Sequence, residues 1–185
     1  MRNLIIDIST YNWVKYCSGM IMKSPVDFSI MIVCRDDTRP IYNCVDKLCK
    51  NALYEQRKND IFNIGRRLGL KKIYNLNHDI NNIDIAKLST EISLNIIVGN
   101  MKEIYCFDNE ILVNIASSIN NKLKRNLYIF GYDNKKTDTI IKLRQDEYNI
   151  KRNLNNLMVG INSPQELIGL EDIEEFHKIG VINGS

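Results

Sequence analysis

The sequence alternates short apolar runs with longer helical patterns, and this alternation constrains the fold more than any other feature. The run "FSIMIVC", residues 28–34, is apolar at every position except Ser29, which is typical of a strand buried on both faces of a parallel sheet. Further strand-like runs occupy residues 4–8, 72–77, 102–107 and 126–132. Helical patterns occupy residues 12–23, 46–68, 85–98, 109–122 and 144–161. The alternation predicts an α/β protein with a Rossmann-like three-layer fold and a mainly parallel central sheet.

The length of the chain and its lack of internal boundaries predict a single domain over residues 1–185. The 185 residues fit one domain, and no repeat, low-complexity segment or long linker divides them. Gly69 follows the second helical pattern and is expected to end that helix as a C′ glycine. The tail from Gly180 is expected to fray, as chain ends usually do.

Charge and cysteine content exclude several classes of protein. The net charge is +3, from 25 basic and 22 acidic residues, which is too balanced for a dedicated nucleic-acid binder. No apolar run approaches the roughly 18 residues of a membrane span, so no membrane association is expected. The five cysteines are odd in number and form no CxxC pair. We therefore expect free thiols and a cytoplasmic location.

The carboxyl ends of the predicted strands are where a ligand site is expected, because open parallel sheets bind ligands there. The segments that follow the strands are residues 9–13, 35–39, 77–79, 107–110 and 132–134. The sequence has no GxxxxGK[ST], GxGxxG or GxSxG motif. A phosphate-binding glycine loop and a serine nucleophile elbow are therefore not predicted.

Two of these segments contain candidate catalytic residues. Asp36 and Asp37 follow the buried strand and could share a metal or divide acid and base roles, although the neighbouring arginines favour local ion pairing instead. His78 and Asp79 follow the third strand and could serve as a base or as metal ligands. The alternative for His78 is a solvated loop histidine with no chemical role.

The stretch "YEQRKNDIFNIGRRLGLKKIYNLNHD", residues 54–79, contains the most specific pattern. A helix contains Arg57 and, three residues later, Asp60; it ends at Leu68-Gly69, and a short strand leads to Asp79. This order resembles the PIG-L/LmbE-like N-acetylglucosaminyl deacetylase superfamily, which has R-x-x-E, a helix, Leu-Gly, a strand and an Asp. Here Asp60 stands in place of the glutamate.

The resemblance extends in both directions. In the family the first strand leads into a His-Pro-Asp-Asp-Glu box and then a small-residue turn, which resembles Cys17-Ser18-Gly19 here. Counting back from Cys17 places residues 9–13 on the box. A late helix with K-x-x-A resembles "EYNIKRNL", with Lys151 in the position of the family's lysine.

The resemblance implies that the zinc-binding box is lost. The positions of the family's His, acid pair and Glu hold Ser9, Tyr11, Asn12 and Trp13, and the third zinc ligand corresponds to Glu110. At most one good ligand then replaces the three that a catalytic zinc needs. We therefore expect no metal and no cofactor, and a pseudoenzyme that binds a ligand or a partner.

The same positions are the candidate ligand-binding residues: Ser9, Tyr11, Asn12, Trp13, Arg57 and Glu110. Trp13 either fills the former metal pocket or offers a stacking face to a sugar or base. Arg57 either binds an anionic group of the ligand or is a solvated helix arginine. The expected ligand is a sugar or nucleotide-like small molecule, and a protein partner is the other option.

Two alternatives stay open. An active hydrolase or deacetylase could act on an N-acetyl sugar conjugate through relocated groups, with zinc as its cofactor; its candidate residues are Asp36, Asp37, His78, Asp79, Asp108 and Glu110. The second alternative is a nucleotide-binding or interaction module that shares only a Rossmann-like sheet.

Overall fold

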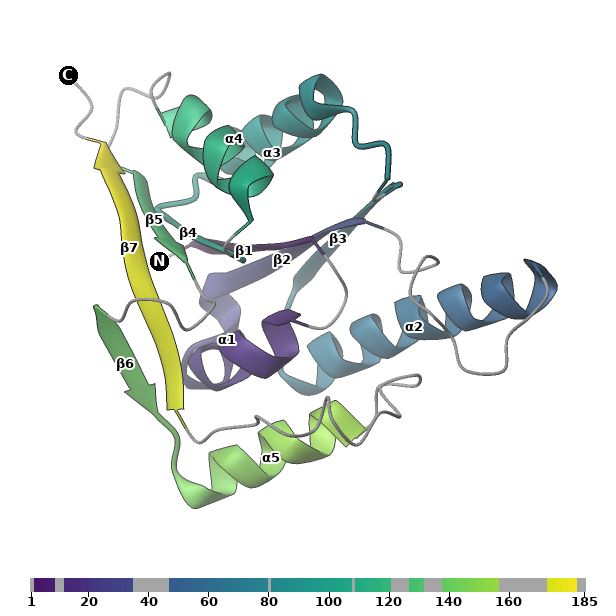
Figure 1. Ribbon diagram of the computed structural model, residues 1–185. Helices are drawn as coiled ribbons and strands as arrows, with labels where there is room; N and C mark the ends of the chain where they lie inside the picture. The colour runs from purple at the N-terminus through teal and green to yellow at the C-terminus, as the bar shows by residue number, and fades with distance from the viewer. Residues whose placement is uncertain are drawn as a thin grey trace.

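The computed structural model describes residues 2–8, 12–34, 47–79, 81–107, 109–120, 127–131, 138–156 and 173–182. Within them the chain forms one seven-stranded sheet covered by helices on both faces (Figure 1). The strands are β1 (Asn3–Asp7), β2 (Phe28–Cys34), β3 (Lys72–His78), β4 (Glu103–Cys106), β5 (Leu127–Gly131), β6 (Thr139–Lys142) and β7 (Ile173–Ile182).

The strand order is β3-β2-β1-β4-β5-β7-β6. The first five strands in this order are parallel, whereas β7 runs antiparallel to β5 and β6 antiparallel to β7. The predicted α/β fold with a mainly parallel central sheet is therefore confirmed, and so are the five predicted strands. The chain adds β2 and β3 on one side of β1 and then β4 and β5 on the other, and this change of side between β1 and β4 creates the switch point where ligands bind in open sheets.

Two strands and one chain end differ from the prediction. The antiparallel strands β6 and β7 were not predicted. Gly180, Val181 and Ile182 pair with β5, so the expectation that the tail frays from Gly180 is wrong for these residues. Their backbone groups are held in the sheet, and pairing of this kind is what ties down a chain end.

The helices are α1 (Asn12–Lys23), α2 (Lys47–Arg67), α3 (Ile85–Gly99), α4 (Glu110–Asn120) and α5 (Gln145–Asn156), with a 3₁₀ turn over Pro25–Asp27. Figure 1 shows α1 and α2 on one face of the sheet, α3 and α4 on the other, and α5 outside α1. Gly69 ends α2 as predicted, with φ +80° and with Leu70 N–H donating to Gly65 O at 2.8 Å. Among the described residues, no helix combines the length and apolarity that a membrane span requires.

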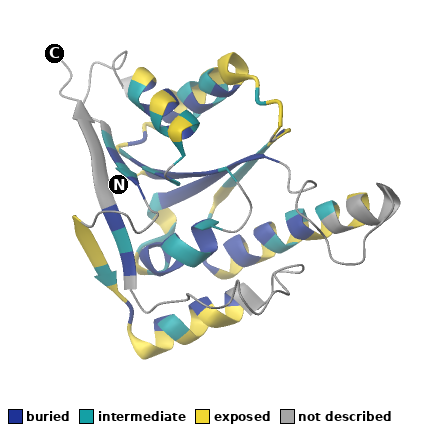
Figure 2. Cartoon of the chain, in the orientation of Figure 1, coloured by how far each residue is buried: buried dark blue, intermediate teal, exposed yellow. Residues whose placement is uncertain are grey.

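The core is divided by the sheet into two apolar clusters. Ile5 and Ile30 pack towards α1 and α2, whereas Leu4, Ile6 and Met31 pack towards α3 and α4. Successive strand residues point to opposite faces, so a continuous apolar run fills both clusters. Figure 2 shows that the central strands and the sheet-facing sides of the helices are buried.

Candidate functional site

The carboxyl ends of the parallel strands meet along one edge of the sheet. Ile8 O accepts from Cys34 N at 3.1 Å, and Ile6 O accepts from Phe107 N at 3.1 Å. Cys34 in turn lies opposite His78. The ends of β1, β2, β3 and β4 are therefore neighbours, and this edge is the candidate site.

The β1–α1 junction is organised by Asp7, which is fully buried. Its Oδ2 accepts from the Trp13 backbone N–H at 2.6 Å, and its Oδ1 accepts from Asn12 Nδ2 at 3.2 Å. A carboxylate at a helix N-terminus stabilises the unpaired N–H groups and the helix dipole. The sequence did contain a signal for this role, namely a single acid inside the apolar run "LIIDI".

Two of the box positions are described by the structure, Asn12 and Trp13, and both hydrogen-bond to Asp7 at the β1–α1 junction. Trp13 is 0% exposed and packs in the core cluster with Val14 and Cys17. Of the two options for Trp13, its burial favours filling of the former metal pocket, because a ring without exposed surface presents no stacking face in this arrangement. A ligand role for Trp13 stays a prediction. Its indole Nε1 is buried with no hydrogen-bond partner among the described residues. Ser9 and Tyr11 lie outside the described residues.

His78 is a strand residue with a partner in α3. It is the last residue of β3, only 7% exposed, and its Nε2 lies 2.8 Å from Glu91 Oε2. The alternative of a solvated loop histidine is therefore wrong. Asp79 is exposed, and its Oδ1 accepts from Asn81 N at 2.9 Å. The two side chains thus have separate partners, while Asp36 and Asp37 lie outside the described residues.

Arg57 is buried at 2% exposure, so the alternative of a solvated helix arginine is wrong. Arg57, Ile61 and Ile64 are spaced by four and three residues and are all buried, which places them on one face of α2. Glu110 begins α4 and is exposed, next to Asn109, whose Oδ1 accepts from Ile111 N at 3.0 Å. A ligand role for Arg57 and Glu110 stays a prediction.

A buried charge cluster lies beneath α1, close to the junction. Lys151 Nζ donates to Glu174 Oε1 at 2.8 Å, and the side chains are 1% and 0% exposed. The backbone N–H groups of Gly19 and Met20 donate to the same carboxylate at 2.7 and 2.8 Å. Burial raises the pKa of Glu174, and Lys151 and the two N–H groups oppose that shift. The cluster joins α1, α5 and β7 through one carboxylate.

Gly19 is required by this cluster for steric reasons. A Cβ at this position would lie 2.1 Å from Leu143 Cδ2 and 3.0 Å from Glu174 Cδ. The carboxylate can approach the helix backbone only because the side chain is absent. This close approach explains the small-residue turn that the sequence analysis noted at residues 17–19.

The described residues do not fit a zinc site. No group of three His, Cys, Asp or Glu side chains lies close enough to hold a metal in the described part of the chain. Asn12, which falls on an acid position of the family's box, already uses its amide on Asp7. Trp13, on the Glu position, offers no ligand atom.

Cys17 is expected to resist alkylation in the native protein. Burial raises the pKa of its thiol, and the Glu174 and Asp7 carboxylates add to the shift. The reactive thiolate is therefore scarce and inaccessible. Iodoacetamide labelling followed by peptide mass spectrometry should detect modification only after unfolding, with the buried Cys34 and Cys106 as internal controls. Rapid native labelling of Cys17 alone would contradict the packing beneath α1.

Known proteins match the structure but not the sequence. No protein-family model matches the chain, and no curated protein matches it. The three-layer arrangement is nevertheless the fold of the PIG-L/LmbE-type deacetylases, as the sequence resemblance predicted.

The similar solved structures include deacetylases and a hydratase. N,N′-diacetylchitobiose deacetylase from Pyrococcus horikoshii has a TM-score of 0.77 and 15% identity, over 99% of this chain and 84% of the other. The A40926 pseudoaglycone deacetylase has a TM-score of 0.67 and 10% identity, over 100% and 98%. The 4-carboxy-2-hydroxymuconate hydratase of Pseudomonas putida has a TM-score of 0.69 and 10% identity, over 97% of both chains. One fold thus supports different reactions, and the site must decide the function.

Proposed function

We propose that this chain is a cytoplasmic, non-catalytic binding protein on the deacetylase fold, with an N-acetylated sugar conjugate as its ligand. The observation that carries the proposal is the β1–α1 junction. Asn12 and Trp13, which fall on the family's box, are used for hydrogen bonding to Asp7 and for core packing. Trp13 has no atom that ligates zinc, and the Asn12 amide Nδ2 donates to Asp7, whereas zinc hydrolysis depends on a metal-bound water.

The ligand class is supported by the similar structures, whose names include a diacetylchitobiose deacetylase and the A40926 pseudoaglycone deacetylase. The binding edge is formed by the carboxyl ends of β1, β2 and β4. Ser9, Tyr11 and Glu110 are the proposed ligand-binding residues, and Arg57, at 2% exposure, would join them only on a rearrangement that exposes it. The buried cysteines at positions 17, 34 and 106 form no disulfide, which agrees with a reducing compartment.

The test measures binding and hydrolysis in the same samples. N,N′-diacetylchitobiose is titrated into the protein by calorimetry, and release of free amine is followed with zinc present and absent. We expect saturable binding without amine release. Glu110→Gln should weaken binding by roughly tenfold or more, because a hydrogen bond to a charged group contributes about 1.5–3 kcal/mol. Glu55→Gln, at an exposed position of α2, is the matched control.

Two results would overturn the proposal. Stoichiometric zinc with amine release would identify an active deacetylase, and Asp36, Asp37, His78 and Asp79 would be the residues to substitute. An absence of sugar binding would exclude the ligand class and favour an interaction module.

A further inference from the structure

Strand β3 is an edge of the sheet. It pairs with β2 on one side, and within the described part of the chain no strand pairs with its other side. An edge strand presents backbone N–H and C=O groups that can pair with another chain. This edge lies apart from the candidate site described above, because the relevant residues are at the amino end of β3.

A hollow of about 490 Å³ lies beside this edge, between β3 and α2. Phe62 and Arg66 of α2 and Ile73 of β3 line it, with Leu70 from the connecting turn. Phe62 is 39% exposed, so its ring offers apolar surface to the hollow. A second hollow of about 360 Å³ shares Arg66 and adds Arg67.

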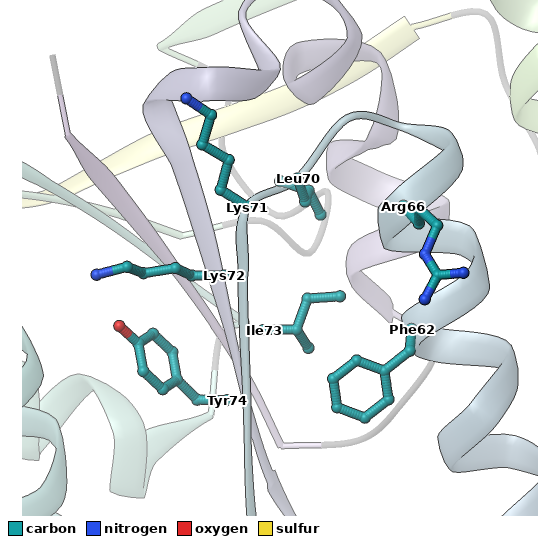
Figure 3. A pocket seen from close by; sticks show the side chains of 7 residues that line it. All are labelled: Phe62, Arg66, Leu70, Lys71, Lys72, Ile73 and Tyr74. Carbon is teal, nitrogen blue, oxygen red and sulfur yellow. The ribbon is translucent and has the colours of Figure 1, made fainter.

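The side chains around the hollow lie on both faces of β3. Figure 3 shows Ile73 directed towards Phe62 and Arg66, and Lys72 and Tyr74 projecting on the other side of the strand. A strand added to β3 alternates its side chains between the same two faces. One set would contact Phe62 and Ile73, and the other would contact Lys72 and Tyr74. In strand addition, side-chain contacts of this kind decide which sequences bind, while the backbone hydrogen bonds supply affinity.

Charge restricts what can pair with this edge. Arg66 borders the hollow, and Lys71 and Lys72 lie at the start of β3. In the described part of the chain no acidic residue lines this hollow, whereas Asp60 lines the second one. Edge lysines disfavour pairing between two copies, because the same positive charges would meet. They favour a segment that brings carboxylates. An acidic partner is therefore preferred over a second copy of this chain.

The usable edge is short. Asn77 has φ +57°, and the pairing register with β2 shifts between Ile32 and Cys34. Tyr54 of α2 also donates a hydrogen bond to Asn77 Oδ1. A bulge of this kind bends an edge and ends regular pairing. The regular part, from Lys72 to Asn75, is the part that lies beside the hollow.

We infer that the Lys72–Asn75 edge of β3 binds an extended acidic segment of another protein by strand addition. Phe62 and Ile73 accept its apolar side chains, and Arg66, Lys71 and Lys72 pair with its carboxylates. This inference is independent of the proposed sugar binding.

The test uses a fluorescein-labelled peptide of about eight residues with alternating valine and glutamate. Fluorescence anisotropy gives the Kd, and hydrogen exchange locates the bound peptide. We expect saturable binding that weakens with salt, and slower exchange at Lys72–Asn75. The double variant Arg66→Glu/Lys72→Glu should weaken binding by about tenfold or more. Lys87→Glu, at an exposed position in the first turn of α3, is the control and should bind as the parent does.

Several results would overturn the inference. A peptide with proline at every second position removes backbone donors, so equal affinity for it would exclude strand addition. Equal binding by a lysine-for-glutamate peptide would exclude charge recognition. Tighter binding of a single-stranded DNA of the same charge would assign the surface to nucleic acid. Concentration-dependent dimerisation that protects β3 would assign it to a second copy.

Discussion

Lys151→Met is expected to lower the free energy of unfolding by about 3–5 kcal/mol, because it leaves a buried carboxylate without its counter-charge. Glu174 is 1% exposed and accepts from Lys151 Nζ and from two backbone N–H groups of α1. The two N–H bonds remain in the variant, but they do not neutralise the charge. Urea unfolding followed by circular dichroism measures the change.

Arg152→Met is the matched control for this prediction. Arg152 is the next residue of α5 and is exposed, so its loss should change the unfolding free energy by less than about 0.5 kcal/mol. The double variant Lys151→Met/Glu174→Gln removes both charges and should recover part of the lost stability. A single variant within about 1 kcal/mol of the parent would contradict the buried pair.

The central sheet could be predicted because its signals are local. Strands β1 and β2 are largely apolar runs, and Gly69 marks a helix end through its own backbone conformation. Both features depend on neighbours in the sequence. They therefore survive in a chain that shares only about 6–15% identity with its structural neighbours.

Strand β7 could not be predicted for the opposite reason. Its sequence "IEEFHKIGVI" places charged residues where a buried strand usually has apolar ones. Glu174 is acceptable there only because α1 and Lys151 satisfy it, and Gly19 is 155 residues away in the chain. No local pattern contains that pairing.

The candidate site was predictable in position but not in the role of its residues. Post-strand segments do meet at one edge, as parallel topology requires. His78 was expected in a loop, but β3 extends through it and Glu91 of α3 covers it. Arg57 could have been predicted as buried, because it falls four and seven residues before Ile61 and Ile64. For Arg57, the helical spacing predicts burial correctly, whereas its charge suggests exposure.

Trp13→Ala is expected to lower the free energy of unfolding by about 3–5 kcal/mol, through lost burial and the cavity left behind. The ring is fully buried between α1 and the sheet, in the same cluster as Ile5 and Leu154. Trp13→Phe keeps most of the apolar contact and should cost less than half as much. Circular dichroism must follow the unfolding, because Trp13 is the only tryptophan and the variant has no indole emission.

The same residue distinguishes a core role from a ligand role. A core Trp13 predicts blue-shifted emission in the parent protein that neither acrylamide nor diacetylchitobiose changes, since neither reaches a ring with 0% exposure. A stacking Trp13 predicts the reverse: quenching by ligand, and a Trp13→Ala variant that keeps its stability but loses binding. The first pattern supports a junction in which the family's Glu position has become part of the core. The second would mean that the junction opens to bind its ligand, and the closed arrangement around Asp7 would then be one of two states.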